Sequence, residues 1–437
     1  MQISVFGLGY VGAVTAACLA KEGHQVLGVD INREKIELLN AGKSPIVEEK
    51  IADIMSAVVE QGNLTATLDS KAAINDTEVS LICVGTPSQD NGSVDLSYIL
   101  RVTEKIGQLL KIKSGFHTLI YRSTIPPGTT EDQIIPLLEE SSGKKIYVDF
   151  DVCFNPEFLR EGSSVYDFYN PPFTVVGLQS EQATRVVETL YSFLHAPLEL
   201  TSIKSAEMLK YVCNSYHALK VCFANEIGMI ARKLGIDGYD IMRLFKLDEK
   251  QNLSGMYLNP GFAYGGSCLP KDIRGLLYLA KQLDYDAPLL SAVPHSNQEQ
   301  LEQGYKLATS FGSKKIGFLG LAFKGGTDDL RESPLVLLAE QLLGKGYELL
   351  IYDKHVNIAR IFGANKSYIE SEIPHIEKLF ASSADDVIHN SEVIIIGNRD
   401  EEYAAAVRNI KDRQLIDFAR IVPDPTRMGD NYHGICW

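Results

Sequence analysis

The chain has 437 residues, of which 45% are hydrophobic and 22% are charged. These ordinary globular proportions exclude collagen-like, disordered and coiled-coil classes, and the length predicts about three domains. The formal net charge is −14, which disfavours nonspecific binding to nucleic acid or to an anionic membrane, although a local cationic cluster can still bind an anionic small molecule.

The first segment predicts a βαβ unit. Residues 3–6 form a β-prone run, residues 13–21 are helix-prone, and residues 25–29 predict a second strand that ends at Asp30. Gly7, Gly9 and Gly12 lie between the first strand and the helix, in the GxGxxG spacing of a dinucleotide-binding turn. We expect Gly7 to allow the tight turn, Gly9 to admit a pyrophosphate, and Gly12 to let helix and strand pack.

Asp30 decides which dinucleotide this unit prefers. A carboxylate at this strand end accepts hydrogen bonds from ribose hydroxyls and repels a 2′-phosphate, so NAD is favoured over NADP. The alternative is a glycine turn that binds no ligand.

Strands and helices continue to alternate to about residue 200, which predicts a parallel sheet with ligands at the carboxyl ends of its strands. Thr86 and Thr124 follow two of these strands. Glu157 and Glu161 lie four residues apart and share a face if their segment is helical. Their spacing leaves an acid–base pair and two solvated carboxylates equally open.

Residues 205–234 contain no proline and predict a helix about 40 Å long. At 100° per residue, one narrow stripe collects its unusual polar side chains, which are Lys210, Asn214, His217 and Asn225. Most other directions are apolar, so we expect the helix to be buried and the stripe to line a site; the alternative is a solvated face.

Cys268 lies in Gly-Gly-Ser-Cys-Leu-Pro-Lys-Asp at residues 265–272. Two glycines remove bulk beside the thiol, Lys271 supplies a cation that favours a thiolate, and Asp272 supplies a possible base. The alternative, a buried structural cysteine, is the default for the other six. With seven cysteines and no CxxC pair, the chain predicts neither a zinc site nor a disulfide framework, and it fits a reducing cytoplasm.

The C-terminal segment repeats the pattern of the first. Residues 314–320 predict a strand and glycine turn, and residues 334–343 predict a helix. Residues 346–353 resemble residues 23–30 position by position, each with a glycine, an aromatic ring, a strand and a terminal aspartate, here Asp353. The repeat predicts a second doubly wound domain that lacks the close glycine triplet. Lys324 and Arg331 follow its turn, either to reach anionic phosphates or as a charged surface loop.

Together, the glycine turn, Lys210 and Asn214 on a long helix, and the Cys268 motif resemble the nucleotide-sugar 6-dehydrogenase family, over essentially the whole chain. Residues 43–48, His217, residues 326–334 and the terminal Gly-Ile-Cys-Trp resemble its GDP-mannose branch. The resemblance implies an α/β fold with two Rossmann-like domains joined by a long central helix and a helical dimerisation region. The expected domains are 1–200 for NAD, 201–310 for the central helices and catalytic cysteine, and 311–437 for the nucleotide sugar.

The resemblance also implies a reaction. The C6 alcohol of GDP-mannose is oxidised twice with two NAD, through a Cys268 thiohemiacetal and thioester, to GDP-mannuronate for alginate-type polymers. Lys210 and Asn214 would stabilise oxyanions, Asp272 with Glu161 would handle water, and Thr124 would lie near the nicotinamide. The expected cofactor residues also include Tyr10, Val11, Lys35, Thr86, Lys271 and Arg331. The expected substrate residues also include His217, Asn225, Tyr257, Phe262 and Lys324.

We further expect a cytoplasmic homodimer, or a higher homo-oligomer, without metal, nucleic acid or membrane partners. Met256 and Asn259 stand where the GDP-mannose branch carries an aromatic residue and an arginine, so a UDP-sugar such as UDP-glucose is the alternative substrate. A two-electron hydroxyacid dehydrogenase shares the first domain and a helix with Lys and Asn, but it does not need residues 260–437. A nucleotide sensor without catalysis is the third alternative.

Overall fold

The computed structural model describes residues 1–249, 254, 257–284, 286–356, 363–373, 375–408, 410–422, 424 and 428–437. The chain divides into two compact units, Met1–Cys213 and Asn214–Trp437. Within the described residues, no helix combines the length and apolar character needed to cross a membrane.

The first unit is built on one eight-stranded sheet with the strand order β3-β2-β1-β4-β5-β6-β7-β8. Its strands are β1 Gln2–Phe6, β2 Gln25–Val29, β3 Leu64–Thr67, β4 Val79–Ile82, β5 His117–Tyr121, β6 Phe150–Phe154, β7 Thr174–Gly177 and β8 Leu198–Thr201. Its helices are α1 Tyr10–Lys21, α2 Arg33–Asn40, α3 Ile51–Glu60, α4 Ser70–Asn75, α5 Ser97–Leu110, the π-helical turn η1 Thr130–Ile134, α6 Ile135–Ser142, α7 Ser164–Tyr169 and α8 Glu181–Leu190.

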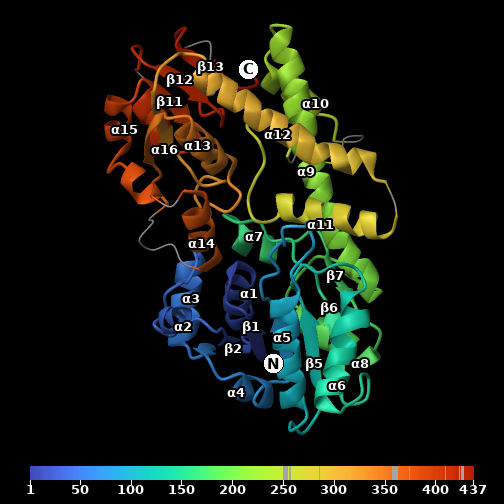
Figure 1. Ribbon diagram of the computed structural model, residues 1–437. Helices are drawn as coiled ribbons and strands as arrows, with labels where there is room; N and C mark the ends of the chain where they lie inside the picture. The colour runs from blue at the N-terminus through green and yellow to red at the C-terminus, as the bar shows by residue number, and fades with distance from the viewer. Residues whose placement is uncertain are drawn as a thin grey trace. The chain divides into compact units, whose positions relative to one another are not determined.

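The central strands read as continuous apolar runs because helices cover both faces of the sheet. Every residue of β4, β5 and β6 is buried. One core packs against α1 and a second against α5 and α6, which lie side by side in Figure 1. This arrangement confirms the predicted doubly wound unit.

One pairing in this sheet contradicts the prediction. β7 runs antiparallel to β6, with Phe154 opposite Gly177, whereas the alternating pattern predicted a wholly parallel sheet. The connection holds only the six-residue helix α7, which packs on α1. A parallel β7 would require a crossover connection, usually a longer helix, that carries the chain back to the other end of the sheet. The short connection does not do this, so β7 begins at the same end of the sheet at which β6 finishes.

The long predicted helix is present as α9, Ile203–Lys233, and the boundary between the units falls within it. Part of its predicted burial is wrong: Val212 and Phe223 are 46% and 44% exposed, whereas Lys210, Asn214 and Asn225 are at most 6% exposed. Within the single chain, the polar stripe rather than the apolar surface is covered.

In the described part of the second unit, five parallel strands form the sheet β10-β9-β11-β12-β13. Their bounds are β9 Lys315–Leu319, β10 Glu348–Tyr352, β11 Val393–Ile396, β12 Gln414–Asp417 and β13 Tyr432–Gly434. The helices are α10 Gly238–Phe245, α11 Leu269–Gln282, α12 Pro288–Thr309, α13 Pro334–Gly344, α14 Gly363–Glu372, the 3₁₀ turn η3 Ile376–Leu379, α15 Ala384–Asn390 and α16 Glu401–Val407. The predicted second doubly wound domain is therefore confirmed.

Candidate active site

The glycine turn of the first unit is held by its own backbone and by Asp30. Gly7 has φ +91°, a conformation that favours glycine, and its N–H donates to the carbonyl of Val29 at 2.8 Å. The Asp30 carboxylate accepts from the N–H of Leu8 at 2.7 Å and lies 3.6 Å from the Lys35 ammonium. A carboxylate offers about four acceptor positions, so Asp30 retains capacity for ribose hydroxyls.

The three glycines differ in the space around them. A Cβ on Gly12 would lie 1.8 Å from the Gly7 carbonyl oxygen, so this position admits only glycine for packing. A Cβ on Gly9 would meet no heavy atom within 4 Å. Gly9 immediately precedes Tyr10 and Val11 at the start of α1, where backbone N–H groups are available to an anion. This open cradle fits the pyrophosphate of a dinucleotide.

The carboxyl ends of β4 and β5 bring the two predicted threonines together. The Thr86 hydroxyl donates to the carbonyl of Thr124 at 2.7 Å. Because neighbouring parallel strands end at one edge of a sheet, side chains that follow them gather beside the glycine turn.

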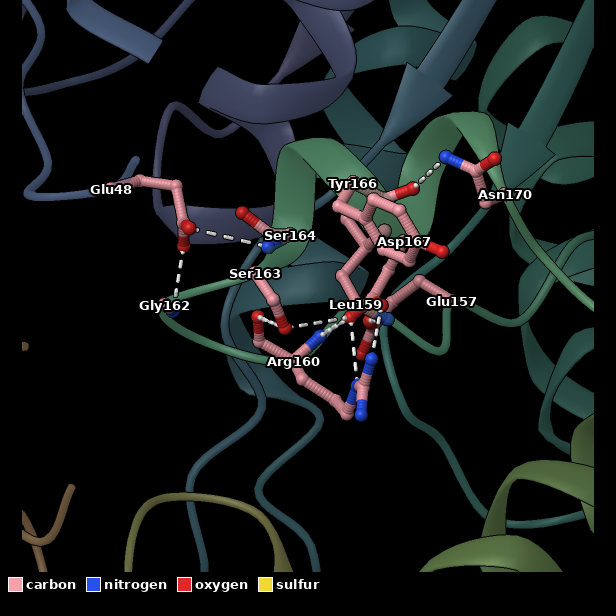
Figure 2. Close-up of polar contacts among 10 residues, drawn as sticks. All are labelled: Glu48, Glu157, Leu159, Arg160, Gly162, Ser163, Ser164, Tyr166, Asp167 and Asn170. Atoms are coloured by element: carbon pink, nitrogen blue, oxygen red, sulfur yellow. Dashed lines mark hydrogen bonds and ion pairs between the residues drawn. The ribbon is translucent and has the colours of Figure 1, made fainter. Parts of the chain in front are cut away.

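Glu157 and Glu161 lie in a loop rather than a helix, so the shared helical face considered from their spacing is absent. Pro156 disfavours helical backbone at Asn155, and the Glu157 carboxylate accepts from the N–H of Leu159 at 2.8 Å. Arg160 is fixed by Asp167, with its guanidinium 2.6 Å from a carboxylate oxygen (Figure 2).

Glu157 is the residue whose role the sequence interpretation missed. The Lys210 ammonium donates to the Glu157 carbonyl at 2.7 Å and to its carboxylate at 2.9 Å. The two side chains are only 5% and 8% exposed. A buried ammonium requires a compensating charge, so the burial of the polar stripe was the available signal for such a partner.

In the second unit, Cys268 is the N-cap residue of α11 and is exposed. A helix N-terminus favours negative charge, which suits a thiolate. All seven cysteines lie in described parts of the chain, and the other six are buried or half-buried. Burial raises the pKa of the Cys18 and Cys83 thiols to about 12 and that of Cys436 to about 11, so these thiols stay protonated near neutral pH.

Asp272 lies one turn after Cys268 on α11 and is 1% exposed. The side-chain amide of Asn214 donates to one of its carboxylate oxygens, and the Lys271 ammonium lies 3.1 Å from the other. The structure therefore brings Asn214, Lys271 and Asp272 into one cluster beside the cysteine turn.

The two glycines before Cys268 are required by a neighbouring loop. A Cβ on Gly265 would lie 2.2 Å from the carbonyl oxygen of Glu332, and one on Gly266 would lie 2.7 Å from the Phe323 ring. Arg274 of α11 also makes two 2.7 Å hydrogen bonds to the Glu332 carboxylate.

The loop that contains Glu332 also carries Lys324 and Arg331. Lys324 is exposed, and the Arg331 side chain, 32% exposed, is oriented by Asp329. Because this loop packs against the turn before Cys268, the two predicted cations lie on a segment held beside the cysteine turn.

The remaining predicted substrate residues lie in the second unit. The His217 and Tyr257 rings stack with centroids 4.6 Å apart. Asn225 accepts from the N–H of Gly261 at 2.9 Å and donates to the carbonyl of Phe262 at 3.2 Å, so its amide holds that loop. The Phe262 ring stacks on another ring of the same unit, that of Phe418.

Met256 lies outside the described residues, whereas Asn259 is exposed and its side-chain oxygen accepts a hydrogen bond from the Lys246 ammonium. A cation therefore stands beside the position where an arginine was expected.

A cavity of about 410 Å³ lies elsewhere in the first unit, between α3 and α7. None of the predicted site residues lines it. The cavity lining contains neither Cys268 nor the glycine turn, so this cavity is not the candidate site.

Three protein-family models match consecutive parts of the chain. The NAD binding domain of the UDP-glucose/GDP-mannose dehydrogenase family matches residues 1–195, its central domain residues 204–299, and its UDP binding domain residues 317–425. The chain belongs to the UDP-glucose/GDP-mannose dehydrogenase family. The predicted resemblance and the enzyme class are confirmed, and NAD is the cofactor that the Gly9 cradle fits.

Individual relatives span the whole chain. GDP-mannose 6-dehydrogenase from Pseudomonas aeruginosa is 50% identical, covering 100% of both sequences. The crystal structure of a ternary complex of GDP-mannose dehydrogenase from the same species matches at 49% identity and a TM-score of 0.58, covering 100% of both chains. A UDP-glucose dehydrogenase structure from Pyrobaculum islandicum matches at 30% identity and a TM-score of 0.90, covering 100% of this chain and 98% of that one.

Proposed function

We propose that this enzyme oxidises the C6 alcohol of GDP-mannose to the carboxylate of GDP-mannuronate, using two NAD per sugar. The observation that carries the chemistry is Cys268, an exposed thiol at a helix N-terminus with the buried Asp272 one turn away. The substrate is supported by 50% identity over the full length to an enzyme that is a GDP-mannose 6-dehydrogenase.

The residues divide the work as follows. NAD bound over Gly9 supplies the hydride acceptor for both oxidations. The Lys210 ammonium, held by Glu157, stabilises negative charge on the C6 oxygen, and Asn214 donates a further hydrogen bond there. Removal of a proton and a hydride from the alcohol leaves an aldehyde for Cys268 to attack.

The Cys268 sulfur forms a bond to the aldehyde carbon and gives a thiohemiacetal. Loss of a second hydride and a proton turns it into a thioester. Water, oriented by Asp272 with Glu161, then breaks the carbon–sulfur bond and releases the carboxylate and the thiol. The balance is one alcohol, two NAD⁺ and one water giving one carboxylate, two NADH and three protons.

The other residues fall into two groups in this proposal. Thr124 lies near the nicotinamide, while Tyr10, Val11, Lys35, Thr86, Lys271 and Arg331 surround the cofactor. His217, Asn225, Tyr257, Phe262 and Lys324 hold the nucleotide sugar. Accordingly, residues 1–200 bind NAD, 201–310 supply the cysteine and central helices, and 311–437 bind the nucleotide.

We also propose a homodimer, formed through the helices that follow the first unit. Tyr216 and Phe223 of α9 are 43% and 44% exposed, and Leu244 of α10 is 50% exposed. Large apolar side chains gathered on neighbouring helices are typical of an interface, and a second copy is the occupant expected here. The seven cysteines form no disulfide, which supports a reducing cytoplasm, and the product suits synthesis of an alginate-type polymer.

A UDP-sugar is the second candidate substrate. Asn259, where a guanidinium was expected, favours it, and the matching C-terminal family model is described as a UDP binding domain. The Lys246 ammonium beside Asn259 favours GDP-mannose, because it supplies a cation where the arginine was expected.

The test measures NADH formed per sugar when GDP-mannose or UDP-glucose is limiting. Two NADH per GDP-mannose and none from UDP-glucose are expected. Cys268→Ser should stop before the carboxylate, while Cys213→Ser, a matched change on α9, should retain full turnover. Two NADH from UDP-glucose alone would replace the substrate but keep the mechanism, and carboxylate formation at the wild-type rate by Cys268→Ser would refute the covalent route.

A further inference from the structure

A short segment of the first unit, residues 44–49, joins two parts of the proposed site that are far apart in sequence. We call it the strap. It lies between α2 and α3, and an internal contact stiffens it: the Ser44 hydroxyl donates to the carbonyl of Ile46 at 2.7 Å. Glu48, near its end, is only 9% exposed.

The Glu48 carboxylate accepts hydrogen bonds from the backbone of the loop that follows Glu161 (Figure 2). One oxygen accepts from the N–H of Gly162 at 2.8 Å, and the other from the N–H of Ser164 at 3.2 Å. The second oxygen also accepts from the N–H of Glu49 at 3.2 Å. Hydrogen bonds to an ionised acceptor are stronger than neutral ones, especially where water is excluded.

At the N-terminus of α7, the Glu48 carboxylate takes the place of an ordinary N-cap side chain. Ser164 is the first residue of α7, and the hydroxyl of the preceding Ser163 accepts no hydrogen bond from the backbone N–H groups of this helix. The Ser163 hydroxyl instead donates to Asp167, which also fixes Arg160. The first N–H of α7 is therefore satisfied by a carboxylate from 116 residues earlier in the chain.

The strap also contacts the cofactor turn. The Tyr10 hydroxyl donates a hydrogen bond to the carbonyl of Val47, the residue before Glu48. Tyr10 is the first residue of α1 and directly follows Gly9, whose open side fits the pyrophosphate. A continuous series of contacts thus runs from the cofactor turn through Val47 and Glu48 to Gly162.

We propose that Glu48 is a positioning residue that fixes the Glu157–Ser163 loop relative to the bound cofactor. It rests on the proposed function, because Glu161 and the Lys210 partner Glu157 are site residues there. Glu48 itself contacts backbone N–H groups rather than reacting atoms, so its effect passes through the loop. Loss of the Glu48 hydrogen bonds leaves the Cys268 thiol and the glycine turn unchanged, but it allows the Glu157–Ser163 loop to move from its position.

The test compares Glu48→Gln with Glu49→Gln, a matched change at the exposed neighbouring carboxylate. Glutamine keeps the size but has one acceptor oxygen, and its amide N–H₂ faces a backbone N–H. We expect hydrogen exchange at the Gly162 and Ser164 amides to accelerate about tenfold or more in Glu48→Gln and to stay unchanged in Glu49→Gln.

The kinetic readout separates positioning from general damage. With the nucleotide sugar that the wild-type enzyme oxidises, Glu48→Gln should lower kcat about tenfold, change KM less, and leave the Kd of NAD unchanged within about twofold. Glu48→Asp, which restores the charge, should recover part of the loss. Equal exchange rates and equal kcat in the Glu48→Gln and Glu49→Gln variants would overturn the inference, whereas wild-type inactivity on GDP-mannose would overturn only the proposed function.

Discussion

Two alanine substitutions in one glycine turn should separate folding from cofactor binding. Gly9→Ala adds a methyl group where no heavy atom lies within 4 Å, and Gly9 has the extended backbone angles, φ −76° and ψ −165°, that alanine accepts. Gly12→Ala adds the same methyl group 1.8 Å from the Gly7 carbonyl oxygen. The chemistry of the change is identical, and only the surroundings differ.

The surroundings of the two glycines predict a small loss of unfolding free energy for Gly9→Ala and a larger loss for Gly12→Ala. Gly9 is the N-cap of α1, where replacing glycine by alanine costs about 1 kcal/mol of unfolding free energy. At Gly12, helix propensity returns about 1 kcal/mol, but the obstructing atom is backbone, so overpacking costs about 3 kcal/mol or more. At 2–4 °C per kcal/mol, the Tm should fall by roughly 4 °C or less for Gly9→Ala and clearly more for Gly12→Ala.

The substitution that costs less stability, Gly9→Ala, should be the one that weakens NAD binding. The Gly9 methyl group occupies the space that the pyrophosphate needs, so the Kd of NAD should rise at least about tenfold in a folded protein. The assays are calorimetric unfolding without ligand and titration calorimetry with NAD. Wild-type NAD affinity in Gly9→Ala, or a wild-type Tm in Gly12→Ala, would refute the assignment of space in this turn.

Three further outcomes follow from the burial or exposure of single side chains. Glu157→Gln removes the negative charge beside the Lys210 ammonium and should lower the free energy of urea unfolding by about 3–5 kcal/mol. Burial lowers the pKa of His117 to about 3, so below pH 6.5 the unfolded chain binds a proton that the folded chain does not. The free energy of unfolding should therefore fall by about 2 kcal/mol between neutral pH and pH 5. His117→Gln should remove this part of the pH dependence. Iodoacetamide should alkylate Cys268 first in the folded protein, read by peptide mass spectrometry, and earlier labelling of a buried cysteine would contradict the assigned exposure.

The sequence predicted the elements whose signals are local. The glycine spacing with Asp30 predicted the first turn, and the absence of proline in residues 205–234 predicted α9, because a long helix and a glycine turn are determined by neighbouring residues. The repeat ending in Asp353 predicted the second sheet for the same reason.

Long-range contacts were not predictable in this way. The Glu157–Lys210 pair joins residues 53 apart, and nothing in the spacing of Glu157 and Glu161 distinguished the buried carboxylate from its neighbour. The antiparallel β7 depends on how far a six-residue helix carries the chain, and the exposure of Phe223 depends on what else covers α9. In each case the missing information is tertiary, because local periodicity indicates only that a face is apolar or polar.

The two doubly wound units use one turn for different purposes. Gly320, with φ +90°, donates to the carbonyl of Tyr352 at 2.8 Å, as Gly7 does to Val29. The position equivalent to Gly9 is Ala322, which is fully buried and whose N–H donates to Asp353 at 3.0 Å.

The second turn therefore offers an anion neither an open cradle nor a free N–H at that position. A phosphate at this position would find no backbone donor in Ala322, and the exposed Lys324 follows two residues later. An open backbone position in the first turn and a closed one in the second explain why one fold, used twice in a chain, requires the glycine triplet only once.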